Sequence, residues 1–176
     1  VYQDHGNLNY AISIRKGHLL IPKDLSETFK ILSSGAVEGL RMFGLNAEFK
    51  PLNDIQINGR KVSGAAGSIR WGTVFHHGSI LVNSNLSILS KVLRSPDRRL
   101  EDKHVQSVRK TVTTIRDELG RDISVDEVKE KLRKGIEKAY KIRLVDGILT
   151  REEELLAEEL LQSKYSREIW NLGNLA

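Results

Sequence analysis

The feature that most limits how this chain can fold is the dipeptide Asn58-Gly59, which lies between two short segments of alternating polar and apolar residues. Asn-Gly in this setting is the strongest short signal for a two-residue hairpin turn, and such a turn fixes the register of the two strands. The predicted cross-strand pairs are Ile57–Arg60, Gln56–Lys61, Ile55–Val62 and Asp54–Ser63. Because side chains alternate across strands, one face of the hairpin is apolar and the other is polar. The apolar face is expected to hold Ile55, Ile57 and Val62, and the polar face Asp54, Gln56, Lys61 and Ser63.

Small residues and a pair of histidines follow the hairpin. Four small residues at positions 64–67 would let a ligand or another backbone lie close to the main chain. Residues 73–82 are expected to form a strand interrupted at His77-Gly78 by a bulge. Lys61 beside this patch indicates a ligand site, although a lysine in such a hairpin also serves as a solvated residue that guards an edge strand against aggregation.

Three helices are predicted from capping pairs, in which an Asp, Ser or Thr precedes a Glu by three residues. These pairs are Asp24–Glu27, Ser124–Glu127 and Thr150–Glu153. The first helix is expected to end near Gly44, and the third to bury Leu156 and Leu160. Residues 164–170 are expected to fold back over the sheet. Strands are also predicted at residues 8–14 and 46–50, a short helix at 84–93 and a charged surface loop at 94–104.

Composition narrows the class of protein. The 176 residues fit one domain with a real core, and they include no cysteine, so no disulfide, thiolate nucleophile or cysteine metal site is available. The net charge of +5 favours an anionic ligand or an acidic partner. Nucleic acid is disfavoured because aromatic residues make up only 6% and no basic tract is interleaved with them. No apolar run approaches the roughly 18 residues of a membrane span and no signal peptide is visible, so we expect a cytoplasmic protein without a membrane partner.

Three motifs occur in the same order as in one known family. The segments NDIQINGRKVSGAAG and HHGSILVN resemble the core of the lipoate–protein ligase family, in which a lysine and a glycine come just before a histidine-glycine strand. The start of the chain, VYQDHGNLNYAI, is similar to the continuation of that family's arginine- and glycine-rich ligand loop. The end, KYSREIWN, is similar to the close of its catalytic domain. The resemblance therefore extends across nearly the whole chain.

This resemblance implies a fold and a domain organisation. The expected fold is α+β, with a mixed, largely antiparallel sheet flanked by helices, as in biotin and lipoate ligase catalytic domains. Residues 1–176 are expected to form a single catalytic domain that lacks the family's first strands and glycine-rich loop. We expect no C-terminal accessory domain, and therefore expect activity to require a separately encoded accessory subunit.

The resemblance also implies a reaction and the residues that carry it. Such ligases join lipoate to ATP, hold lipoyl-AMP and pass the lipoyl group to a lysine of a carrier domain. A fixed ammonium stabilises the negative charge that develops in both steps, and Lys61 is the candidate catalytic residue. Mg²⁺ is expected to bridge the leaving pyrophosphate, with its protein ligands unidentified. Residues expected to bind ATP or the acyl-adenylate are Val1, Asp4, Gly6, Asn7, Asn53, Asp54, Gly64 and Ala65. Residues expected to line the acyl chain are His77, Gly78 and Ser79.

The implied partners are lipoyl domains of 2-oxoacid dehydrogenase E2 or the H protein of glycine cleavage. One alternative is a sibling that takes octanoyl from a carrier protein; members that use a cysteine nucleophile are disfavoured here, and members that rely on lysine alone are not. Biotin ligation shares the fold, but GRKVSGAAG and HHG are more similar to the lipoate side. A noncatalytic basic module that recognises nucleic acid or a carrier is the third alternative.

Overall fold

The computed structural model describes residues 2–22, 24–92 and 111–173. Val1 and the loop predicted at residues 94–104 lie outside this described part. The chain divides into two compact units, Val1–Arg143 and Leu144–Ala176, and each unit is described here by itself. The assignment of residues 1–176 to a single catalytic domain stays a prediction.

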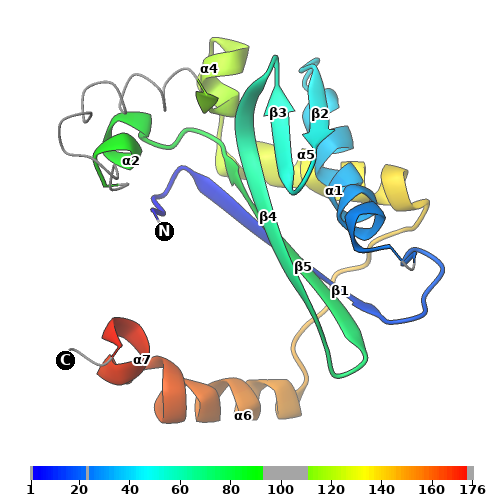
Figure 1. The fold of residues 1–176 in the computed structure, drawn as a ribbon, viewed down its shortest axis with the longest axis vertical. Helices are drawn as coiled ribbons and strands as arrows, with labels where there is room; N and C mark the ends of the chain where they lie inside the picture. Colours follow the sequence, from blue (N-terminus) through cyan, green and yellow to red (C-terminus); the bar gives the residue numbers. More distant parts are fainter. Residues whose placement is uncertain (1, 23, 93–110, 174–176) are drawn as a thin grey trace. The chain divides into compact units, whose positions relative to one another are not determined.

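The first unit is built on one five-stranded sheet in the spatial order β1-β5-β4-β3-β2 (Figure 1). All four neighbouring pairs of strands are antiparallel. The strands predicted at residues 8–14 and 46–50 are confirmed with slightly different ends, and the α+β fold is confirmed. The strands are β1 (Asn7–Arg15), β2 (Ala47–Lys50), β3 (Asp54–Ile57), β4 (Arg60–Arg70) and β5 (Thr73–Leu81).

The register of the β3–β4 hairpin differs from the prediction beyond its first two pairs. Ile57–Arg60 and Gln56–Lys61 are confirmed, but Ile55 lies opposite Ser63 and Asp54 lies opposite Gly64. The predicted pairs Ile55–Val62 and Asp54–Ser63 are wrong because β4 carries one extra residue there, which is a β-bulge. As a result, Ser63 is buried on the core face and Gly64 takes its place on the polar face.

The bulge predicted at His77-Gly78 is also wrong. β5 is continuous, and its pairing with β1 and β4 runs without a register shift from Thr73 to Ile80. Gly78 is needed for a different reason: a Cβ there would lie 2.7 Å from the Tyr10 ring on the neighbouring strand. The glycine therefore marks a close side-chain approach rather than a break in the strand.

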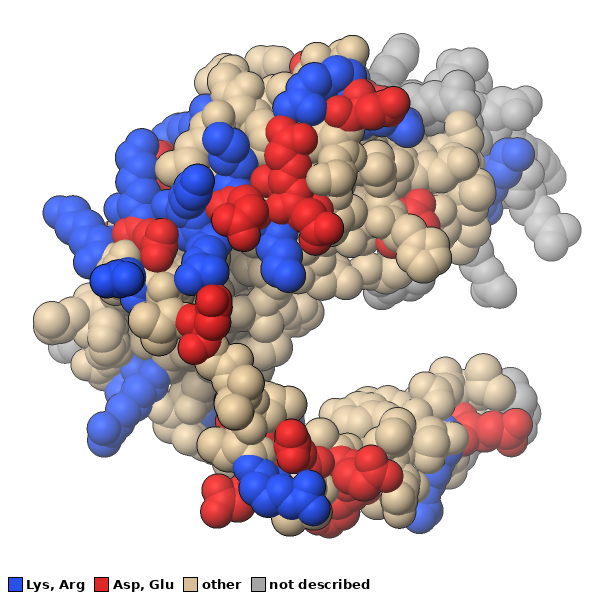
Figure 2. All heavy atoms as spheres, turned by 180° about the vertical axis from the view of Figure 1, so that it is seen from behind, with Lys and Arg blue, Asp and Glu red and all other residues tan. Residues whose placement is uncertain are grey.

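Helices cover one face of the sheet. α1 (Leu25–Arg41) and α5 (Val125–Tyr140) cross on that face, and α2 (Leu86–Val92) and α4 (Ile115–Leu119) lie near the end of the sheet where β5 ends (Figure 1). Asp24 and Ser124 accept hydrogen bonds from the backbones of Glu27 and Glu127, as the capping pairs predict. Over α5, basic and acidic side chains are interspersed (Figure 2).

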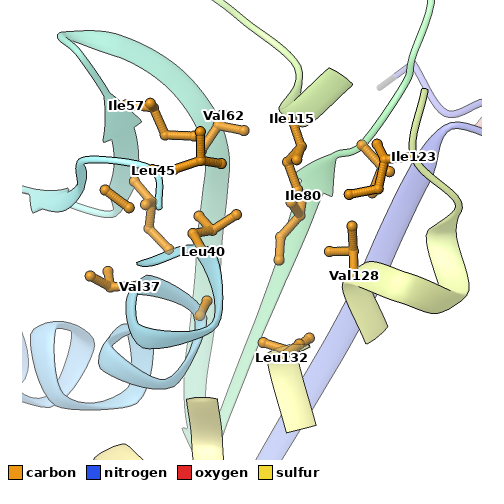
Figure 3. Close-up of a cluster of buried hydrophobic side chains, with 14 residues drawn as sticks. Val37, Leu40, Leu45, Ile57, Val62, Ile80, Ile115, Ile123, Val128 and Leu132 are labelled. Atoms are coloured by element: carbon orange, nitrogen blue, oxygen red, sulfur yellow. The ribbon is translucent and has the colours of Figure 1, made fainter. Parts of the chain in front are cut away.

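The main core lies between this face and the helices (Figure 3). Its side chains come from strands β2 to β5, from α1, α4 and α5, and from connecting segments at Leu45, Val82 and Ile123. Burial of such apolar groups is the main stabilising contribution to the fold. The labelled members are Val37, Leu40, Leu45, Ile57, Val62, Ile80, Ile115, Ile123, Val128 and Leu132.

The second unit contains α6 (Arg151–Leu160), a π-helical turn (Leu161–Tyr165) and α7 (Glu168–Leu172). Thr150 and Glu153 form the predicted capping box. The predicted burial of Leu156 and Leu160 is wrong, because α6 has no buried residue and Leu156 is 54% exposed. The helix is amphipathic, and its apolar side chains Leu155 and Leu156 are exposed. In the part of the chain that the structure describes, no helix is both long and apolar enough to span a membrane.

Candidate functional site

The face of the sheet opposite α1 and α5 is hollowed into a trough with a volume of about 710 Å³. The trough runs across the three strands β1, β5 and β4. Its lining combines small residues, amides, two aromatic rings and one histidine. These residues are Gln3, Asn9, Tyr10, Ala11, Asn53, Gly64, Ala65, Ala66, Phe75, His77, Gly78 and Ser79.

Strand register explains why the trough forms there. In one cross-strand row Asn9, Ser79 and Gly64 are neighbours, and in the next row on the same face Ala11, His77 and Ala66 are neighbours. Side chains in such rows project to the same side of the sheet. Because most of them are small, they leave room above the backbone for an extended ligand.

An ion pair lies beside the trough. The Lys61 Nζ is 2.6 Å from the Asp54 Oδ1, and the two side chains are 42% and 27% exposed. A Cβ on Gly64 would come within 3.2 Å of both the Cε and the Nζ of Lys61. The bulge in β4 therefore has a local consequence, because it places a glycine where a regular strand would place Ser63. Lys61 is held in position and still accessible to a ligand.

Asn53 connects the start of β3 to the floor of the trough. Its side-chain amide donates a hydrogen bond to the Ala65 carbonyl, and the Ala65 amide donates one to the Asn53 carbonyl. These reciprocal bonds hold the residue preceding Asp54 against β4. Asn53 therefore positions the carboxylate partner of Lys61 as well as lining the trough.

The turn at residues 4–7 is fixed by hydrogen bonds. The Asp4 carboxylate accepts from the backbone amides of Gly6 and Asn85 and from the Tyr2 hydroxyl, and Asn7 donates to the Ser79 hydroxyl. Partial burial alone would raise the pKa of Asp4, but the hydrogen bonds outweigh that effect and lower the pKa below its usual value. A Cβ on Gly6 would lie 2.4 Å from the Ser84 backbone nitrogen, so only glycine fits there.

The two histidines of β5 face opposite sides of the sheet, as strand alternation requires. His77 lies in the trough with its ring centroid 5.4 Å from that of Phe75. His76 is 1% exposed and lies on the core side, between the rings of Tyr10 and Phe29. Burial, with a smaller contribution from the neighbouring His77, lowers the pKa of His76 to about 4.

The structure brings together most, but not all, of the residues predicted for the site. Asn53, Gly64, Ala65, His77, Gly78 and Ser79 line the trough, and Lys61 with Asp54 adjoins it at Gly64. Asp4, Gly6 and Asn7 form a turn at the start of β1 and are not among the lining residues; Val1 lies outside the described part. Ala66, part of the predicted small-residue patch at positions 64–67, also lines the trough, whereas the sequence predictions missed Gln3, Asn9, Tyr10, Ala11 and Phe75. Asn9 and Ala11 alternate along β1 with its larger apolar residues, and this alternation is the sequence signal that could have identified them.

Metal ions in proteins are held by groups of His, Asp, Glu or Cys side chains. Within residues 2–22, 24–92 and 111–173, no three His, Asp or Glu side chains are grouped so that they could hold a metal ion. Asp54 lies next to the trough residue Gly64 and is paired with Lys61. These described residues therefore contain no site of three or more protein ligands, whereas Mg²⁺ that binds with ATP commonly takes only one or two carboxylates.

Fold and trough together define a class of protein: an α+β domain that can hold an extended small ligand on the open face of an antiparallel sheet, next to a lysine. Residues 1–137 match the family described as the lipoyl protein ligase A/B catalytic domain. The chain belongs to this family of lipoate ligases and acyltransferases, which confirms the family resemblance seen in the sequence.

Known relatives and solved structures agree with this assignment. Lipoate-protein ligase A subunit 1 of Thermoplasma acidophilum is 35% identical over 99% of this chain and 68% of its own length. The structure of a bi-partite lipoate protein ligase and its E2 lipoyl domain from the same organism matches all of the chain and 68% of its own, with 36% identity and a TM-score of 0.88. A lipoate-protein ligase A bound with ATP matches 99% of the chain and 68% of its own, with 33% identity and a TM-score of 0.83.

The family also includes relatives that are named for a different activity. Octanoyltransferase LipM of Brevibacillus brevis is 29% identical over 94% of this chain and 68% of its own length. The comparisons thus establish an enzyme of the lipoate ligase and transferase family, and they leave both activities within that family.

Proposed function

We propose that this chain is the catalytic part of an ATP-dependent lipoate–protein ligase. It would activate lipoate as lipoyl-AMP and transfer the lipoyl group to a lysine of a lipoyl domain. The observation that carries the proposal is the Lys61–Asp54 ion pair beside a trough of small residues. Support comes from the 35% identical relative, which is named as a lipoate ligase subunit.

The first step would form the acyl-adenylate. A lipoate carboxylate oxygen attacks the α-phosphorus of ATP, a new phosphorus–oxygen bond forms, and the bond to the leaving pyrophosphate breaks. Negative charge increases on the phosphoryl oxygens in the transition state. The Lys61 ammonium, oriented by Asp54, would stabilise that charge, and loss of one such preorganised donor commonly costs about 10²- to 10³-fold in rate.

The second step would transfer the acyl group. The neutral amine of the carrier lysine attacks the carbonyl carbon of lipoyl-AMP, the amide bond forms, and AMP leaves with the bonding electron pair while the amine proton passes to solvent. Lys61 would then stabilise the developing oxyanion and the leaving phosphate. A charged side chain that serves both steps from one position needs no rearrangement between them.

Other residues would each contact a different part of the acyl-adenylate. The trough, with His77, Gly78 and Ser79 on β5, would hold the acyl chain. Asn53, Asp54, Gly64 and Ala65 would contact the carboxylate and the α-phosphate at the Lys61 end. Asp4, Gly6 and Asn7 would approach the nucleotide through their rigid turn, and Val1 would precede it. ATP would be a substrate, and Mg²⁺ would accompany it as the counter-ion of its phosphates.

The protein partners would be an acceptor and an accessory subunit. The acceptor is proposed to be a lipoyl domain of a 2-oxoacid dehydrogenase E2 or a glycine cleavage H protein. The similar structure from Thermoplasma acidophilum is described as that of a bi-partite lipoate protein ligase and its E2 lipoyl domain. By analogy, a separately encoded subunit would complete the present enzyme.

The test is intact-mass analysis of an apo lipoyl domain incubated with the enzyme, its accessory subunit, lipoate, ATP and Mg²⁺. We expect a lipoyl mass increase that requires ATP, and a loss of at least about 100-fold in rate for Lys61→Met. Lys134→Met, which removes an exposed lysine on α5, is the matched control and is expected to react normally. Unchanged lipoylation by Lys61→Met would contradict the proposed role of Lys61.

The second candidate is octanoyl transfer from a carrier protein, which the similarity to octanoyltransferase LipM favours. These 176 residues contain no cysteine, so they cannot form an acyl-thioester on the enzyme. Acyl transfer from octanoyl-carrier without ATP, in the same mass assay, would establish the transferase and overturn the ligase. A noncatalytic basic module is the remaining alternative, and it predicts no mass increase with either donor.

A further inference from the structure

The far end of the open sheet face carries positive charge that no described carboxylate balances. β1, β4 and β5 contain four cationic residues and no Asp or Glu. Two of these, Arg60 and Lys61, form ion pairs with carboxylates from other elements. The other two, Arg15 and Arg70, are exposed and form no ion pair with another described residue.

Register places these two arginines together on the trough side of the sheet. Both are cross-strand partners of Thr73, Arg15 from β1 and Arg70 from β4, and they therefore flank it in one row. That row lies two residues beyond Phe75 on β5, on the same face. Lys16 is joined to the β4–β5 turn by its backbone amide, which donates to the Gly72 carbonyl.

An exposed tryptophan completes this surface, which we call the hairpin tip and define as Arg15, Lys16, Arg70 and Trp71. Trp71 is 94% exposed at the turn between β4 and β5. An indole and guanidinium groups are the side chains most enriched at the energetic centres of protein interfaces. The hairpin tip therefore combines an anchor ring with a local charge of +3.

We propose that the hairpin tip docks an acidic surface of the carrier domain that accepts the acyl group. This inference rests on the proposed function, since it assumes that a carrier lysine reaches the Lys61 end of the trough. α1 and α5 cover the other face of the sheet, so an acceptor has to approach the open face. The α5 side offers no comparable surface, because basic and acidic side chains are interspersed there (Figure 2).

Distances are compatible with one carrier domain that contacts both places. Along β4, Gly64 and Arg70 are six residues apart, which corresponds to about 20 Å of strand. A compact domain of about 80 residues has a radius of gyration of about 12 Å. Such a domain can hold its lysine over the Lys61 end and place carboxylates over the hairpin tip. Complementary charges of this kind act mainly on the association rate and on the choice of partner.

The experiment is a direct titration of an apo lipoyl domain, by calorimetry or biolayer interferometry, onto the enzyme with its accessory subunit and without ATP. Two variants test the hairpin tip: Arg15→Glu with Arg70→Glu, and Trp71→Asn. Trp71 and Gly72 have φ values of +50° and +72°, and Asn-Gly is the preferred pair for such a turn, so Trp71→Asn removes the ring without straining the hairpin. The control Lys134→Glu reverses an exposed charge on α5.

We expect carrier affinity about tenfold weaker for the arginine double variant, with a weaker dependence on salt, and a several-fold loss for Trp71→Asn. KM for lipoate and the rate of lipoyl-AMP formation should not change, and Lys134→Glu should bind normally.

If the wild type lipoylates the carrier and the variants bind it equally well, the docking inference is overturned and the enzymatic proposal stands. If the wild type binds the carrier but transfers nothing, the enzymatic proposal fails, and the docking surface is judged by the same variants. Retention of carrier affinity together with lost binding to anionic vesicles or to nucleic acid would assign the hairpin tip to those partners and overturn the inference.

Discussion

At the scale of single residues, the candidate site depends on three positions that lie close together only because of the bulge in β4. Lys61 and Asp54 form the ion pair, and Gly64 leaves the space that the lysine side chain occupies. A regular strand would put Ser63 at that place and would push the ammonium away from the carboxylate. Position 64 therefore controls where the positive charge of the site is held.

Gly64→Ala tests this steric argument. The new Cβ would lie 3.2 Å from the Cε and Nζ of Lys61, which is tighter than an ordinary contact, so the lysine has to move. We expect lipoyl-AMP formation to slow by about tenfold or more, because a small displacement of the Lys61 ammonium from its productive position lowers the rate of the chemical step. Gly147→Ala makes the same chemical change where no atom lies within 4 Å and should be neutral. An unchanged rate with Gly64→Ala would mean that Lys61 does not need its present position.

His76 provides a pH-dependent contribution to stability. Its pKa is about 4 in the folded protein, compared with the ordinary 6.5 in the unfolded chain, because burial disfavours the charged imidazole. As the pH falls below 6.5 the unfolded chain takes up this proton and the folded protein does not, so the free energy of unfolding decreases until about pH 4. The largest loss is about 3 kcal/mol. Urea titrations at several pH values should show that the pH dependence is reduced in His76→Gln and retained in the exposed control His5→Gln. Equal pH slopes for His76→Gln and the wild type would contradict this contribution.

At the scale of elements, the sequence predicted what is locally encoded. Capping pairs and alternation identified the three long helices and the strands, because those signals act within a few residues. The bulge at Val62 and the continuity of β5 could not be predicted in the same way, since both depend on the partner strand. Gly135 gives another example: a Cβ there would lie 2.3 Å from the Gly35 carbonyl oxygen of α1, a close helix crossing that no periodicity shows. For the same reason the prediction found Lys61 and His77 but missed Ala11, which joins the site only through the β1–β5 pairing.

Strand spacing also gives the trough a length. Ser79 and Phe75 lie four residues apart on the same face of β5, which corresponds to about 13 Å. This span is comparable to an extended medium-chain acid whose carboxylate lies at the Lys61 end, so the Phe75 ring is placed to contact the far end of the chain. In the proposed reaction, β5 would therefore set the length of the acyl chain that the trough accepts.

Phe75→Ala should therefore shift the acyl-chain preference toward longer acids. Each additional buried methylene contributes about 0.8 kcal/mol, or roughly fourfold in affinity, once the ring no longer blocks it. Competition among acids of eight, ten and twelve carbons, read by intact mass of the carrier, measures the shift. Ile69→Ala, which removes an exposed side chain from the opposite phase of β4, is the control. An identical preference in Phe75→Ala would show that this ring does not set the chain length.

At the scale of the whole molecule, the buried apolar residues that the structure describes all belong to the first unit. Both core clusters are composed of residues from Leu8 to Tyr140, and none of the described residues 144–173 takes part. The second unit, by contrast, exposes Leu156, Ile169 and Trp170 among other apolar side chains. The stability of the first unit is therefore expected not to depend on the C-terminal helices α6 and α7.

A chain truncated after Arg143 tests that separation. We expect it to unfold in one cooperative step with a free energy of unfolding within about 1 kcal/mol of the full chain, because the truncation removes no core residue. A chain that ends at Ser124 loses Val128 and Leu132 with α5 and should not fold, which provides the matched control. If the chain of 143 residues also fails to fold, the second unit contributes to the core after all. If it folds but no longer forms lipoyl-AMP, the expectation that residues 164–170 fold back over the sheet gains direct support, because the loss could not be attributed to an unfolded catalytic unit.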